Sequence, residues 1–232
     1  MSTSLAIFVK TPGLSPVKTR LAVDIGIAAA EHFHRLAAAA VAAVARAAVP
    51  TVSPCWAVAE RSALDHPQWQ GMPTLWQGEG DLGQRLHHVC SRRQASDGRV
   101  LLIGADAPQI TVPLLAAAVA ALAEPATPFV LGRASDGGFW LFGTRQPVPQ
   151  AAWLAPRYSS ADAADDLQQA LTPLGAIAAL PTLRDVDYGA DLTALAAALD
   201  ALDDPLPSQS ALRDWLHRLR PFSTSAPQES NR

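Results

Sequence analysis

The sequence has few cysteines and no long apolar run, and each shortage excludes a class of protein. Its 232 residues include 2 cysteines, Cys55 and Cys90. They form neither a CxxC motif nor a Cys/His spacing, so we expect no zinc site and no redox pair, and we predict two reduced packing residues. Hydrophobic residues make up 49% of the chain, yet no uncharged apolar run reaches the roughly 20 residues that span a bilayer. A membrane protein is therefore not expected.

Charge is also sparse. Charged residues make up 17% of the chain, the formal net charge is -3, and the cations do not gather into one run. This pattern does not indicate nucleic-acid binding, so any anionic ligand must be held by a few local cations. The first ten residues contain no basic segment that leads into an apolar core, which predicts a cytoplasmic protein. The composition leaves the oligomeric state open.

Strand-like and helix-like segments alternate along the chain. Apolar runs predict buried strands at residues 5–9 and 99–104, and an alanine-rich stretch predicts a long helix from Ile27 to Ala48. Further strands are expected near 52–59, 73–77, 129–132, 137–143 and 176–180, and further helices near 83–94, after Thr111, and near 160–171, 190–202 and 210–219. The alternation predicts an α/β fold with an open, mostly parallel sheet and helices on both faces.

We expect one domain over residues 1–221 and a polar, disordered tail over 222–232. In open α/β sheets, ligands bind beyond the carboxyl ends of the strands. The segments that follow the expected strands are therefore the places to look for chemistry.

Three cations lie in and just after the loop that follows the first expected strand: Lys10, Lys18 and Arg20. Cationic side chains and backbone N–H groups in such a loop can surround phosphate oxygens. The loop lacks the GxxxxGK[ST] pattern, so a P-loop kinase or ATPase is not indicated. The alternative interpretation is that these cations are only solvated.

Aspartates follow two of the later strands. Asp106 comes directly after the most apolar strand, where a carboxylate could hold Mg²⁺ against phosphates or could form a turn. Asp185 and Asp187 alternate in "RDVDYGADL", so in an extended segment both project from one face, which suits a divalent cation. Capping of the next helix is the alternative, and it explains Asp191 best.

Two glycine-containing motifs have both a structural and a functional interpretation. "SDGG" lies between two apolar runs, which is a strong hairpin signal. The functional alternative is that its glycines let a ligand approach the backbone while Asp136 points at an acceptor hydroxyl. In "GDLGQRL", Gly80 and Gly83 could leave room for a base or ribose, or the motif could simply begin a helix with Asp81 as its cap.

Together and in this order, "FVKTPGLSPVKTRLA", "GDLGQRL", "LLIGADAP", "SDGGFWLFG" and "RDVDYGADL" resemble a bacterial family of glycosyltransferase-A-like (GT-A) proteins. Its members are often labelled radical SAM/selenodomain-associated transferases. The family is itself similar to molybdenum-cofactor guanylyltransferases and 2-phospholactate guanylyltransferases. The resemblance runs from about Ser4 to Leu202. It implies a GT-A, nucleotide-diphospho-sugar-transferase fold, a Rossmann-like three-layer sandwich.

The resemblance also implies roles for individual residues. Lys18 and Arg20 match cationic positions expected on a phosphate chain, and with Asp106 they are the expected catalytic residues. Asp106 and Asp187 match aspartates expected to hold Mg²⁺ or Mn²⁺. The other matching positions are Gly80 and Gly83, expected near the nucleotide base, and Asp136, Gly137 and Gly138, expected on the acceptor side. Lys10 of the cationic loop is a further expected nucleotide-binding residue.

The function implied is a metal-dependent transferase. It would move a nucleotidyl or sugar group from a nucleoside triphosphate or a nucleotide sugar to a small-molecule acceptor, and the sequence does not choose between the two transfers. The alternative is a non-catalytic nucleotide sensor or accessory protein. The altered first loop favours that alternative, because Leu14 and Ser15 replace a usual Pro-Gly. Tyr188 is a second departure from the family pattern, since a small hydroxyl residue is usual there.

Overall fold

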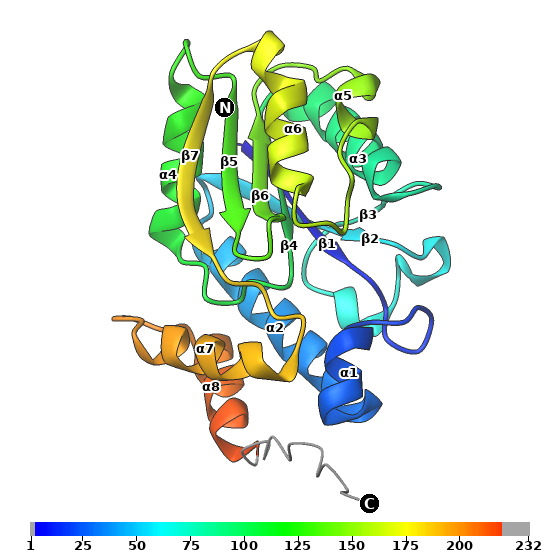
Figure 1. The fold of residues 1–232 in the computed structure, drawn as a ribbon, viewed down its shortest axis with the longest axis vertical. Helices are drawn as coiled ribbons and strands as arrows, with labels where there is room; N and C mark the ends of the chain where they lie inside the picture. The colour runs from blue at the N-terminus through cyan, green and yellow to red at the C-terminus, as the bar shows by residue number, and fades with distance from the viewer. Residues whose placement is uncertain (1–2, 220–232) are drawn as a thin grey trace, which may run out of the picture.

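A seven-stranded sheet forms the middle layer of the protein (Figure 1). The computed structural model describes residues 3–219, so the expected tail at 222–232 lies outside the described residues. The strand order is β3-β2-β1-β4-β6-β5-β7. The strands are β1 (Thr3–Val9), β2 (Val52–Val58), β3 (Thr74–Trp76), β4 (Val100–Gly104), β5 (Phe129–Ala134), β6 (Phe139–Thr144) and β7 (Ile177–Leu183). Four of the six pairings are parallel, which confirms a mostly parallel sheet.

Strand β1 lies inside the sheet, between β2 and β4, and the carboxyl ends of such strands are where ligands of open α/β sheets bind. Its register pairs Ile7 with Trp56 of β2 and with Ile103 of β4. All three side chains are buried, because helices cover both faces of the sheet, and this explains the continuous apolar runs. Since β1 and β4 are parallel neighbours, the cationic loop after β1 and the aspartate after β4 leave the sheet at the same edge.

Helices cover both faces of the sheet. They are α1 (Thr19–Ile25), α2 (Ile27–Ala47), α3 (Leu82–Asp97), α4 (Val112–Ala123), α5 (Gln150–Leu154), α6 (Ala163–Leu171), α7 (Gly189–Asp200) and α8 (Pro207–Arg218), with short 3₁₀ turns at Arg61–Ala63, Pro67–Trp69 and Thr172–Leu174. One face packs against α2 and α4, and the other packs against α3, α5 and α6 (Figure 1). The expected three-layer α/β sandwich is confirmed.

A third apolar core lies beside the sandwich, below the sheet in Figure 1. It joins α1, the first half of α2, α7 and α8 through buried side chains such as Leu21, Phe33, Leu195 and Leu212. We call these four helices the helical cluster. Because α1 and α7 begin directly after the cationic loop and after "RDVDY", the helical cluster anchors both segments.

Most sequence predictions of local structure are confirmed. Both cysteines are free and buried, and the Thr111 side chain accepts a hydrogen bond from the Leu114 N–H at 3.3 Å at the start of α4. The short helices α1 and α5 were not predicted. None of the helices within residues 3–219 is long and apolar enough to cross a membrane.

Candidate active site

Lys18 joins three segments at the carboxyl edge of the sheet. Its Nζ atom lies 2.9 Å from Asp106 Oδ1 and 3.6 Å from Asp187 Oδ1, and it donates a hydrogen bond to the Val186 carbonyl at 2.5 Å. A lysine ammonium carries three N–H donors, so these three oxygens can take all of them. The structure therefore brings a predicted phosphate ligand together with both predicted metal ligands.

The backbone of Lys18 is held in an unfavourable conformation. Lys18 is the N-cap of α1 and has φ 46° and ψ 45°, in the left-handed region. For a residue other than glycine, this conformation costs roughly 1–2 kcal/mol. Such strain persists where the surroundings over-determine it, and it concentrates at functional sites. The ammonium of this strained residue is the group that contacts Asp106, Val186 and Asp187.

Arg20 is more accessible to solvent than Lys18, the other cation that matches the family motif. Its side chain is 51% exposed and its Nη1 atom donates to Asp187 Oδ2 at 2.7 Å. The guanidinium carbon also lies 5.9 Å from the centroid of the exposed Tyr188 ring. The hydrogen bond and the charge of Asp187 raise the pKa of Arg20 above its ordinary value. Asp187 thus carries two cationic partners.

Asp106 is an ionised carboxylate in this arrangement. Burial raises the pKa of Asp106, but the charge and hydrogen bond of the Lys18 ammonium outweigh that effect, so the pKa lies below its ordinary value. The Asp106 side chain remains 48% exposed. A charged carboxylate at the edge of a central strand is therefore available to a ligand on its open side.

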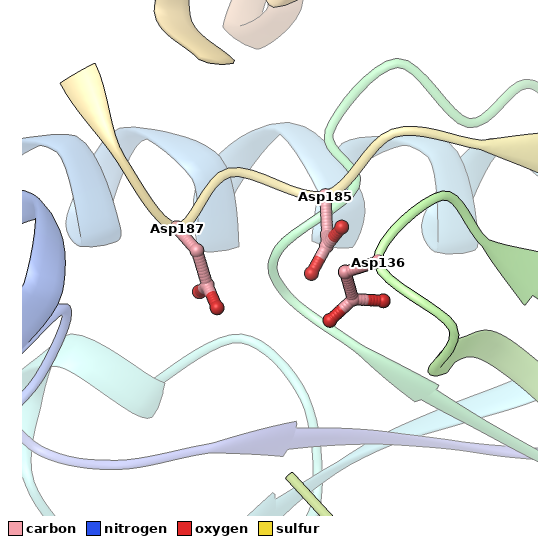
Figure 2. Close-up of side chains that lie close together, drawn as sticks. All are labelled: Asp136, Asp185 and Asp187. Carbon is pink, nitrogen blue, oxygen red and sulfur yellow. The ribbon is translucent and has the colours of Figure 1, made fainter. Parts of the chain in front are cut away.

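Asp187 and two further carboxylates could together hold a metal ion. Asp136, in the turn between β5 and β6, and Asp185 and Asp187, after β7, each offer an oxygen, and these oxygens lie within 4.8 Å of one another (Figure 2). Burial and the neighbouring Asp136 and Asp187 carboxylates raise the pKa of Asp185 to about 6. Hard oxygen ligands suit Mg²⁺ or Mn²⁺, and a divalent cation would relieve this repulsion. These residues therefore fit a metal, and the group contains Asp187 but not Asp106.

A cavity of about 120 Å³ lies beside these carboxylates. Asp106, Asp136 and Asp185 line it, together with the aromatic side chains of Phe139 and Trp140. The Trp140 ring of this wall is anchored, because its Nε1 atom donates a hydrogen bond to the Pro181 carbonyl at 3.1 Å. The cavity can take a small group with an apolar edge.

The "SDGG" motif forms the predicted turn between antiparallel strands β5 and β6. The Gly138 N–H donates to Asp136 Oδ1 at 2.7 Å, as in an Asx turn. Gly137 has φ 90°, and a Cβ atom there would lie 1.9 Å from the Ala161 carbonyl oxygen. The glycine therefore allows a close approach of protein backbone, and the role of this motif toward an acceptor stays a prediction.

The start of α3 also follows its structural interpretation. Asp81 Oδ1 accepts the Gln84 N–H at 2.9 Å, and Gln84 Oε1 accepts the Asp81 N–H at 2.9 Å, which is a capping box. A Cβ atom on Gly83 would lie 2.4 Å from the Trp153 carbonyl oxygen, and one on Gly80 would meet the Gln84 side chain. Backbone packing therefore requires Gly83, and the φ of 91° favours glycine at position 80, while the place of both glycines near a base stays a prediction.

Sequence reasoning missed the polar support beneath the cationic loop. The exposed Lys10 has its carbonyl oxygen 2.9 Å from Nε2 of the buried His34. The Thr11 N–H donates to Glu60 Oε2 at 2.9 Å, and Trp69 Nε1 donates to Thr11 Oγ1 at 3.0 Å. Burial lowers the pKa of His34. These partners lie far from the loop in sequence, so no local spacing could reveal them.

Comparison with known proteins adds a family and a fold class. Residues 35–160 match the sequence family described as "Uncharacterized protein conserved in bacteria (DUF2064)". No curated protein matches the chain. Among solved structures, a protein from Desulfovibrio desulfuricans G20, described as a "putative nucleotide-diphospho-sugar transferase", is 26% identical with a TM-score of 0.81. The match covers 94% of this chain and 98% of that one.

Two more distant structures share the fold. CMP:2-keto-3-deoxy-manno-octonic acid synthetase complexed with CTP is 14% identical, with a TM-score of 0.51 and coverage of 86% of this chain and 99% of that chain. Rv0371C from Mycobacterium tuberculosis H37Rv, in complex with manganese, is 13% identical, with a TM-score of 0.50 and coverage of 87% and 100%. The predicted nucleotide-diphospho-sugar-transferase fold is therefore confirmed. Because the family match spans more than half of the 232 residues, the chain belongs to the DUF2064 family.

Proposed function

We propose that the protein is a metal-dependent transferase that binds a nucleoside triphosphate or a nucleotide sugar and passes its nucleotidyl or sugar group to a small acceptor. The observation that carries this proposal is the meeting of Lys18 and Arg20 with Asp106 and Asp187 at one edge of the sheet. A related fold in complex with CTP and another in complex with manganese support a nucleotide and a metal. The radical SAM/selenodomain association and the kinship to guanylyltransferases stay predictions.

The cations of the site would act on the phosphate chain. In either transfer, negative charge accumulates on phosphate oxygens in the transition state, and fixed cations there lower the barrier. Arg20 and Lys10 are exposed at this edge, so both side chains are accessible to the phosphates of a bound nucleotide. Lys18 is nearer to the carboxylates and would have to exchange their oxygens for those of a phosphate.

The metal would be held by Asp187 together with Asp185 and Asp136. Mg²⁺ or Mn²⁺ supplies positive charge that stabilises phosphate oxygens in the transition state. Asp106, the other predicted ligand, faces Lys18 at the same edge. The acceptor would occupy the cavity between Asp136 and Trp140, which is also lined by Asp106, the ion-pair partner of Lys18.

The two transfers release different products, and this difference gives the test. The purified protein is incubated with Mg²⁺, a panel of nucleoside triphosphates or nucleotide sugars, and candidate acceptors. Pyrophosphate release indicates nucleotidyl transfer, and nucleoside diphosphate release indicates glycosyl transfer. Asp187→Asn serves as the inactive control. Absence of both products with every pair would argue against the transferase.

A nucleotide sensor is the second candidate. The observations that favour it are the departure at Leu14 and Ser15 and the engagement of Lys18 with protein oxygens. Calorimetry separates the two functions, because a sensor binds nucleotide tightly without Mg²⁺ and shows no turnover. Nucleotide affinity that depends on Mg²⁺, combined with product formation, rejects the sensor.

A further inference from the structure

The Lys18 ammonium occupies a position that resembles a cation site. Its oxygen neighbours are one carboxylate oxygen of Asp106, one of Asp187, and the carbonyl of Val186. Carboxylate and carbonyl oxygens are the donor set that hard divalent cations use in proteins. The positive charge of Lys18 therefore lies between the two carboxylates, Asp106 and Asp187, that the family resemblance assigns to a metal.

Lys18 differs from Arg20 in how firmly it is held. The Lys18 side chain is only 6% exposed, whereas that of Arg20 is 51% exposed. Arg20 contacts Asp187 alone among the described carboxylates, and it does so from the solvent side. Lys18 instead bridges the segment after β4 and the segment after β7 from a strained backbone.

We propose that Lys18 competes with the divalent cation for Asp106 and Asp187, so that the metal gains Asp106 only when the phosphates of a ligand draw the ammonium away. This inference rests on the metal and nucleotide of the proposed function. Two cations that share one carboxylate repel each other strongly at such short range. Without a nucleotide, the metal is therefore held by Asp185, Asp136 and an Asp187 carboxylate that it shares with Lys18. Phosphate binding completes the metal site by releasing Asp106.

The first test measures Mn²⁺ affinity without any nucleotide, by electron paramagnetic resonance, for four proteins: wild type, Lys18→Met, Asp106→Asn and the double variant. We expect Lys18→Met to bind Mn²⁺ about tenfold more tightly than wild type, a coupling of ordinary size for charged neighbours. Asp106→Asn changes the affinity of wild type by less than about threefold but costs Lys18→Met about tenfold. Arg213→Met is the control for the loss of one positive charge, with an expected change of less than about threefold because its carboxylate partners are Asp200 and Asp214 of the helical cluster.

The second test measures binding of inorganic triphosphate in EDTA, which needs no knowledge of the base. Asp106→Asn removes a partner of Lys18 and is expected to strengthen triphosphate binding several-fold, and Lys18→Met to weaken it. Thermal denaturation confirms that each variant is folded.

Unchanged or weaker Mn²⁺ binding by Lys18→Met, equal Asp106→Asn effects in both backgrounds, or no Mn²⁺ binding at all would overturn the competition. Triphosphate binding that is absent or that Asp106→Asn weakens would overturn the release by phosphate. Neither assay measures turnover, so failure of the transferase proposal would appear separately, in the product assay.

Discussion

Asp106 and Asp185 are the same residue type at one edge of the sheet, yet their electrostatic surroundings are opposite. Asp106 faces the Lys18 ammonium at 2.9 Å, and its pKa lies below the ordinary value. Asp185 forms no ion pair among residues 3–219, and burial and neighbouring acids raise its pKa to about 6. Asp187 belongs to both surroundings. The site thus has a cation-paired side, formed by Asp106 and Lys18, and an open side, formed by Asp185 and Asp136, and the two sides share Asp187. An added cation is expected to be stabilised most on the open side.

The largest expected effect comes from the shared residue. Asp187→Asn removes a contact from Lys18, Arg20 and the proposed metal at once, so we expect a loss of turnover of about 100- to 1000-fold, the range seen when one transition-state contact is removed. The measurement is the rate of pyrophosphate or nucleoside diphosphate release. Asp203→Asn, at an exposed position outside the site, is the control. A loss smaller than that of Asp106→Asn would show that the two sides do not meet at Asp187.

The next prediction concerns the accessible cation of the paired side. Arg20→Met is expected to weaken nucleotide binding, because it removes a charge-assisted contact to phosphate, with a smaller effect on metal binding. Calorimetric titration in Mg²⁺ measures this change. Arg213→Met, which removes an arginine of the distant helix α8, is the control for net charge. Equal weakening by both variants would mean that Arg20 acts only through overall charge.

The open side is expected to carry a pH-dependent cost in stability. The folded-state pKa of Asp185 is about 6, above the ordinary 3.8. The stability that a protonated Asp185 contributes is therefore fully present below about pH 4 and is lost as the pH rises through about 6. In metal-free buffer, Asp185→Asn should raise the free energy of unfolding by about 1 kcal/mol at pH 7.5 and change it little at pH 4. Urea denaturation at both pH values measures this, and an equal effect at both would reject the repulsion.

The smallest effect is expected at Tyr188, where the ring lies beside the Arg20 guanidinium on the surface. An exposed cation–π contact is worth about 0.5–1 kcal/mol. Tyr188→Thr, which restores the small hydroxyl residue usual in the resembled family, should therefore change nucleotide affinity by less than about fivefold. A larger change, measured in the same calorimetric titration, would indicate that the ring contacts the nucleotide itself.

Much of the fold could be predicted from the sequence because its signals are local. Apolar runs marked β1 and β4, Asp-Gly marked the β5–β6 turn, and Asp81 marked the start of α3. Helix α1 was missed because it has only 7 residues, which follow a loop with two prolines and end at Gly26. A segment so short gives little helical periodicity to read.

The sequence could predict which residues belong to the site, but not which contacts they make with one another. Parallel strands explain why Lys18 and Asp106 leave the same edge. Nothing in the local pattern could say that the Lys18 ammonium would turn inward to the Val186 carbonyl, a residue 168 positions away, or that Asp185 would join Asp136 and Asp187. Those contacts depend on a left-handed backbone at Lys18 and on how α7 is placed, both of which are set by tertiary packing.

The helical cluster has a consequence for how this protein tolerates change. Its apolar interior is separate from the two cores of the sandwich. Helix α1 contains Arg20, and helix α7 begins two residues after Asp187, so the packing of these helices positions both residues. The positions of the Arg20 and Asp187 side chains thus depend on the packing of leucines and a phenylalanine that lie outside the proposed site. We expect the loss of a single methyl group from those side chains to displace Arg20 and Asp187, and therefore to weaken phosphate binding, before it measurably lowers the free energy of unfolding.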